Sequence, residues 1–163
     1  MDKANLLILL GTLGIRYDIF EHAPVMTVEE SSRFHKNIPG MPCKCLFLKS
    51  KDTRYWLVAV LSKMRVNLKS LQRESQCSRL SFAGGDSLME LLGVTPGAVT
   101  LFAVVNDIAG AVGVAMEKSL AETELFCFHP LVNTATIALS PDDMRKVFAH
   151  TGHDPIVVHE IGL

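Results

Sequence analysis

Two apolar runs joined by a short polar turn constrain the fold of this chain more than any other feature. The runs occupy residues 43–49 and 55–61, and Lys51-Asp52-Thr53-Arg54 lies between them. Short runs rich in β-branched and aromatic residues, bounded by turn residues, are typical of paired strands. We therefore predict a β-hairpin here, against which the rest of the chain must pack.

Lys44 is the unusual residue of the first predicted strand. With the two-residue period of a strand it shares a face with Leu46 and Leu48. A lysine seldom lies on an apolar face without a partner. One interpretation is an ammonium group directed into a pocket floor, where it meets an anion or a carbonyl oxygen. The other is a lysine at the strand's end whose side chain reaches solvent.

The remaining elements follow from capping residues, apolar periodicity and breaks. Helices are predicted at 3–13, 28–35, 67–74, 86–92 and 141–150, with Thr27, Asn67, Asp86 and Ser140 as caps. Further strands are predicted at 17–21, 80–83, 100–106, 111–116, 125–128 and 134–139, the third and fourth forming a second hairpin. Strands and helices do not alternate strictly, so we predict one α+β domain over 1–163, with a mixed, mostly antiparallel sheet flanked by helices.

Charge and cysteine content narrow the functional classes. The net charge is −1 and the isoelectric point is near 6.6, which argues against a duplex-DNA binder with a basic face. The four cysteines form no C-x-x-C pair, so we expect buried free thiols. No secretory leader or membrane-spanning run is apparent in the sequence. We expect a reduced, cytoplasmic protein without membrane contacts.

The sequence also lacks the motifs of covalent, phosphate-loop or metal-dependent enzymes. No G-x-S-x-G or G-x-x-x-x-G-K-[ST] pattern occurs. His150, His153 and His159 lack a fitting thiol or carboxylate, so we expect no zinc and no other cofactor. An enzyme with these residues must work by positioning and polarisation. Hydrolysis of an activated ester, such as an aminoacyl ester, meets that limit.

Two loops carry candidate polar groups. In the first, Pro130 restricts His129 to extended geometry at the end of a strand, with Asn133 nearby. This histidine is either a site residue or a cap that bonds a backbone carbonyl. In the second, residues 93–97 (Gly-Val-Thr-Pro-Gly) either expose amide groups to a ligand or form an ordinary helix end and turn.

Three motifs in order resemble the YbaK/ProX family of aminoacyl-tRNA editing domains. They are Lys44-Cys45-Leu46-Phe47-Leu48, Gly93-Val94-Thr95-Pro96-Gly97, and Phe128-His129-Pro130 followed by Asn133-Thr134-Ala135-Thr136. The resemblance spans nearly the whole chain. It implies a curved mixed sheet flanked by helices and the removal of a wrong amino acid from tRNA in trans.

The resemblance also implies the site residues. Lys44 would contact the terminal adenosine or its phosphate, Gly93 and its neighbours would offer amide groups to the aminoacyl moiety and the water, and His129 would bind the ribose or the aminoacyl end. These three are the predicted catalytic residues. The predicted substrate-binding residues are Thr27, Phe34, Pro96, Asp107 and Asn133. Cys43 and Cys45 flank Lys44 where the family has Thr or Asn, so the rim of the pocket is expected to differ.

The Gly-Val-Thr-Pro-Gly loop resembles the ProX branch, which implies Ala-tRNA(Pro) as the substrate. A small pocket would accept alanine and exclude proline by steric clash. The alternatives are a Cys-tRNA(Pro) deacylase, a non-catalytic module that binds tRNA or a synthetase, and a nucleic-acid-binding regulator, which the charge disfavours. The expected partners are the 3′ end of aminoacylated tRNA(Pro) and prolyl-tRNA synthetase, but not duplex DNA or a membrane.

Overall fold

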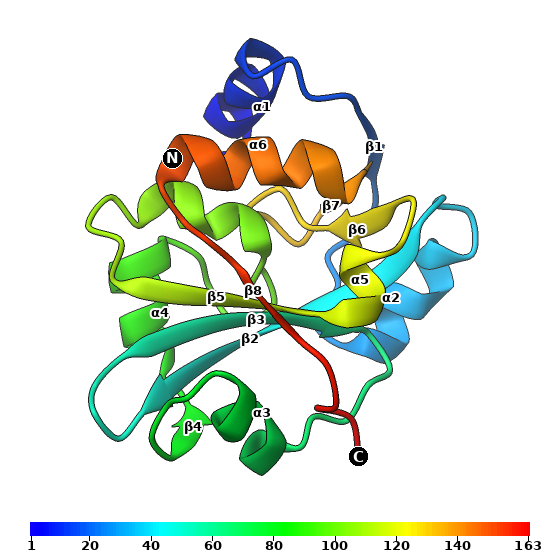
Figure 1. Cartoon of the computed structure of the whole chain (residues 1–163). Helices are drawn as coiled ribbons and strands as arrows, with labels where there is room; N and C mark the ends of the chain where they lie inside the picture. The colour runs from blue at the N-terminus through cyan, green and yellow to red at the C-terminus, as the bar shows by residue number, and fades with distance from the viewer.

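The fold is a mixed sheet with helices on both faces (Figure 1). The computed structural model describes residues 1–163 apart from the side chain of Val28. The strands are β1 (Tyr17–Glu21), β2 (Met41–Ser50), β3 (Tyr55–Leu61), β4 (Leu80–Phe82), β5 (Val112–Glu117), β6 (Phe126–Phe128), β7 (Ala135–Leu139) and β8 (Ile156–Val158). The helices are α1 (Lys3–Thr12), α2 (Val28–His35), α3 (Leu68–Glu74), α4 (Gly85–Leu92), the 3₁₀ helix η1 (Leu101–Asn106), α5 (Lys118–Ala121) and α6 (Pro141–Thr151).

The predicted hairpin of β2 and β3 forms the centre of the sheet. The two strands pair antiparallel, and the register places Lys44 opposite Val60. The sheet continues on both sides in the order β1-β7-β6-β2-β3-β5-β8, while β4 pairs with the far end of β2. Parallel pairs join β2 to β6, β3 to β5 and β5 to β8, and the other pairs are antiparallel. The predicted α+β class with a mixed sheet flanked by helices is confirmed.

Each face of the sheet buries its own core. The larger core packs α1, α4, α6 and η1 against one face, with the Phe102, Phe126 and Phe148 side chains almost fully buried. The smaller core lies on the opposite face, where α3 packs through Leu71 on Leu48. Figure 1 shows α1 and α6 above the central strands and α3 below them. Because the sheet is covered on both faces, β3 and β5 are apolar on both faces.

Helix α2 stands beside the start of β2 and begins as the sequence predicts. The hydroxyl of Thr27 accepts a hydrogen bond from the Glu30 amide at 3.2 Å, and the Glu30 carboxylate accepts from the amides of Met26 and Thr27 at 2.7 and 3.3 Å. This capping box satisfies amide groups that have no partner within the helix. It thereby fixes where the chain enters α2.

The predicted strand at 100–106 is wrong. These residues form η1, and the hydroxyl of Thr100 caps it by accepting from the Phe102 amide at 3.3 Å. The run is buried in the larger core, and a short continuous apolar run is ambiguous between strand and buried helix. The second predicted hairpin fails with it, because β5 pairs in parallel with β3 and β8.

Two smaller features also differ from the predictions. Helix α4 begins at Gly85 with Gly84 as its cap, so Asp86 lies in the first turn instead of capping the helix. A carboxylate there still interacts favourably with the helix dipole. The short helix α5 has no predicted counterpart and begins where Glu117 accepts from the Ser119 amide at 3.0 Å. Among the residues that the structure describes, no helix is long and apolar enough to span a membrane.

Candidate active site

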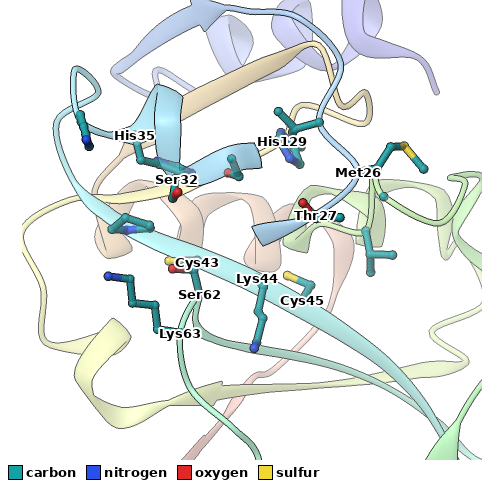
Figure 2. A pocket seen from close by; sticks show the side chains of 16 residues that line it. Met26, Thr27, Ser32, His35, Cys43, Lys44, Cys45, Ser62, Lys63 and His129 are labelled. Carbon is teal, nitrogen blue, oxygen red and sulfur yellow. The ribbon is translucent and has the colours of Figure 1, made fainter. Parts of the chain in front are cut away.

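A cavity of about 570 Å³ opens between α2 and the first residues of β2 (Figure 2). Its volume is within the range of small-molecule sites. Helix α2 and the loop before it form one wall, and the start of β2 forms the other. The lining residues are Val25, Met26, Thr27, Ser31, Ser32, His35, Lys36, Pro42, Cys43, Lys44, Cys45, Ser62, Lys63, Gly97, Val99 and His129.

The α2 wall presents small and polar side chains. Thr27, Ser31 and His35 follow one another at intervals of four residues, so they share one face of the helix. The predicted pocket residue Thr27 is thus at the cavity, and its hydroxyl also caps the helix. Phe34, also predicted for the pocket wall, does not line the cavity. It stacks on His22 with ring centroids 5.0 Å apart.

Lys44 lines the cavity from β2 and is half-buried. Burial lowers the pKa of its ammonium group, and the nearby Glu29 carboxylate partly opposes that shift. Figure 2 shows the side chains of Lys44 and Lys63 extending on one side of β2, with His35 and His129 on the other. All four residues line the cavity, although β2 lies between the two lysine side chains and the two imidazoles in this view.

His129 lines the same cavity from the loop after β6. Its Nδ1 lies 2.7 Å from the carbonyl oxygen of Ala135. A carbonyl oxygen only accepts, so Nδ1 carries the proton and Nε2 keeps a free lone pair. Burial lowers the pKa of His129; the Ala135 bond opposes the shift and the neighbouring His22 adds to it. The histidine therefore bonds a backbone carbonyl, as one interpretation of the sequence predicts, and it also lines the cavity.

His22 lies behind His129, with ring centroids 5.9 Å apart. Its Nδ1 is 2.9 Å from the Ala23 carbonyl oxygen, and its Nε2 is 2.8 Å from the Thr136 hydroxyl. The carbonyl oxygen fixes the proton on Nδ1, so Nε2 accepts from the hydroxyl. The oxygen of Thr136 is then left with its lone pairs for a further donor.

The glycine-rich loop reaches the cavity through different residues from those predicted. Gly93 is exposed, does not line the cavity, and ends α4 at a φ of 63°, where its amide donates to the Met89 carbonyl oxygen at 3.0 Å. Pro96 is exposed and also lies outside the cavity lining. Gly97, at a φ of 90°, and Val99 line the cavity instead.

Two further predicted residues lie outside the cavity lining. The Asn133 amide donates to the Val25 carbonyl oxygen at 3.0 Å and so holds the segment that enters the cavity wall. Asp107 is buried elsewhere. Its carboxylate accepts from the amides of Ala111 and Val112 at 2.9 and 2.8 Å and contacts Nε2 of His153 at 3.0 Å. These contacts involve both oxygens of Asp107, and its role in substrate binding stays a prediction.

The two cysteines beside Lys44 give the cavity a small, uncharged surface. Cys43 and Cys45 both line it, and burial strongly raises the pKa of each thiol. Burial also raises the pKa of Cys127 to about 12. Thiols that stay protonated are poor nucleophiles. No group of three or more metal-ligating side chains is present among the described residues.

Sequence reasoning missed much of the helix wall. His35 was one of its omissions, although the four-residue spacing from the Thr27 cap through Ser31 to His35 is visible in the sequence. Lys36 and Lys63 had no comparable signal, because lone surface lysines are common. Their position at the cavity depends on how α2 and the end of β3 approach each other.

Comparison with known proteins places this chain in a defined family. The aminoacyl-tRNA editing domain family matches residues 22–147. The prolyl-tRNA synthetase associated domain-containing protein 1 of Bos taurus is 37% identical over 155 residues, covering 92% of this chain and 90% of its own. The prolyl-tRNA editing protein ProX of Acetoanaerobium sticklandii is 35% identical over 145 residues, covering 88% of each.

A solved structure supports the fold independently. It is described provisionally as a trans-editing enzyme for prolyl tRNA synthetase, and it superposes with a TM-score of 0.73 at 18% identity over 98% of each chain. An ester-hydrolysing editing domain is the class that fold and sequence define. The chain belongs to the aminoacyl-tRNA editing domain family. This membership confirms the predicted resemblance and the prediction of an aminoacyl-tRNA deacylase.

Proposed function

We propose that the protein is a trans-editing deacylase that removes alanine from mischarged tRNA(Pro). One observation carries the proposal: Lys44 and His129 line the same cavity, and the chain belongs to the editing family. The relatives named for prolyl-tRNA synthetase and for prolyl-tRNA editing support the choice of tRNA(Pro). They also support prolyl-tRNA synthetase as a partner.

The cationic side of the cavity suits the nucleotide end of the substrate. Lys44 lines the cavity, and Lys36 and Lys63 lie at its surface with exposed side chains. Ammonium groups bind phosphate as point charges. Lys44 then orients the terminal adenosine or its phosphate, while the other two lysines face the preceding nucleotides.

The opposite side suits the aminoacyl end. Ser31, Cys43, Cys45 and Gly97 line it with small side chains, which suits a methyl group better than a proline ring. A pocket of this kind excludes a larger side chain by clash. The free Nε2 of His129 accepts a hydrogen bond from a ribose hydroxyl or from water. Positioning, without a covalent intermediate, then suffices for an activated ester.

The test is hydrolysis of tRNA(Pro) charged separately with alanine, cysteine and proline. We expect alanine to be released and proline to be retained. Lys44→Ala should lower kcat/KM by about 10- to 100-fold, since a hydrogen bond to a charged group contributes roughly 1.5–3 kcal/mol. Lys51→Ala, in the exposed turn after β2, is the matched control. Preference for cysteine would refute the alanine assignment, and hydrolysis of none of the three would refute the proposed function.

A further inference from the structure

A second, much smaller hollow adjoins the cavity. Its volume is about 20 Å³, and it is bordered by several residues that also line the cavity, among them His35 and His129. We call it the niche. A space of roughly 10–15 Å³ is enough to hold one water molecule if polar groups surround it. The niche has this volume and borders the wall where the ester would lie.

The niche has the polar groups that a water molecule needs. Nδ1 of His35 is buried and makes no hydrogen bond to any residue that the structure describes. A buried nitrogen without a partner is costly, so a niche water that bonds it is favoured. Nε2 of His129 offers a lone pair because Nδ1 is bonded to Ala135. The Thr136 oxygen also borders the niche, with its proton directed to His22.

Burial at the niche favours the uncharged form of the imidazoles. Cys43 and Cys127 border it as thiols whose pKa burial raises, and Lys44 is the one cationic side chain among its described lining residues. Burial lowers the pKa of His35, and the neighbouring imidazoles of His129 and His22 lower it further, because a second positive charge beside them is unfavourable. In a neutral imidazole, one ring nitrogen donates a hydrogen bond and the other accepts one.

We propose that His35, together with His129 and Thr136, holds in the niche the water that hydrolyses the ester. This inference rests on the proposed function and gives His129 a hydrolytic role. The water donates to Nε2 of His129 and to the Thr136 oxygen, accepts from Nδ1–H of His35, and keeps one lone pair for the cavity. Three partners are typical of a buried water.

The chemical step balances with these groups alone. The water oxygen bonds to the carbonyl carbon of the ester, and the proton it loses passes to Nε2 of His129. The tetrahedral intermediate then collapses, and the bond from carbon to the ribose oxygen breaks. The ribose oxygen takes the proton back from His129, so the products are the free amino acid and uncharged tRNA. His35 stays neutral and holds the water throughout.

The experiment compares His35→Leu and His35→Gln with the control His150→Gln, an exposed histidine on α6. We expect His35→Leu to lower kcat on Ala-tRNA(Pro) about tenfold or more, with KM changed by less than twofold. His35→Gln should restore part of kcat, because its amide can bond the water. A merely structural role in the cavity wall would raise KM, so this split separates the two roles.

A second measurement does not depend on activity. Long-range ¹H–¹⁵N spectra of the histidine rings report the hydrogen bonding of His129 Nε2 in each variant. We expect this ¹⁵N shift to move in His35→Leu and to stay in His150→Gln. An unchanged shift with unchanged kcat would overturn the inference, as would a rise in KM alone. If no charged tRNA is hydrolysed but the shift moves, the proposed function fails and the water site stands.

Discussion

Replacing Asp107 by alanine tests whether this buried carboxylate maintains the fold or binds substrate. Its oxygens accept from the amides of Ala111 and Val112 and contact the ring of His153, whose side chain is only 5% exposed. Asp107→Ala leaves three donors without an acceptor. Each buried donor without a partner costs about 1–3 kcal/mol. The partial exposure of the Ala111 amide puts the total at roughly 3–6 kcal/mol.

This loss is large compared with the stability of a domain, which is about 5–15 kcal/mol. Asp107→Asn is therefore the companion variant. Its amide oxygen can still accept one hydrogen bond, so we expect a cost of roughly 1–3 kcal/mol. Urea unfolding measures both losses, and deacylation assays of the folded protein measure KM. A loss below about 1 kcal/mol in both variants would refute the reasoning. So would a rise in KM at unchanged stability, which would assign Asp107 to the substrate.

Three other predictions concern the cavity walls. Gly97→Ala should destabilise the protein by about 1–2 kcal/mol, because its φ of 90° disfavours a side chain. Gly11→Ala, inside α1 and with open space around it, should not destabilise the protein. Thr27→Ala should cost about 0.5–2 kcal/mol in thermal unfolding through the lost cap of α2, and equal stability would contradict this. His35 and His129 have a lowered pKa in the folded state, so the unfolded chain binds more protons as pH falls below 6.5. Stability should therefore fall between pH 7.5 and 5.5, and the double variant His35→Gln/His129→Gln should flatten that slope.

Much of the fold could be predicted from local signals. The capping box at Thr27, the hairpin turn before Tyr55 and the Ser140-Pro141 helix start are all decided by nearby residues. The run at 101–106 could not be assigned in this way, because tertiary burial on every side removes the periodic pattern. The pairing of β5 with β3 and β8 is likewise set by packing between distant segments.

The site was predictable only in part, for a similar reason. Lys44 and His129 carry chemical groups that stand out against apolar neighbours, and both line the cavity. Gly93 and Gly97 share one short loop, and both have positive φ angles. Sequence alone does not show which of them faces the ligand. His35 lines the cavity because α2 packs against β2. The residues near His35 in the sequence do not predict this contact between the helix and the strand.

The most direct test of the central claim is an NMR titration with a non-hydrolysable 3′-alanylamide of adenosine. If the cavity is the editing site, the largest backbone shifts will fall on its walls, at Thr27, Lys44, Gly97 and His129. Lys44→Ala should weaken this binding, and Lys51→Ala should not. Shifts confined to the neighbourhood of Gly93 or Asp107, or no binding at all, would contradict the account.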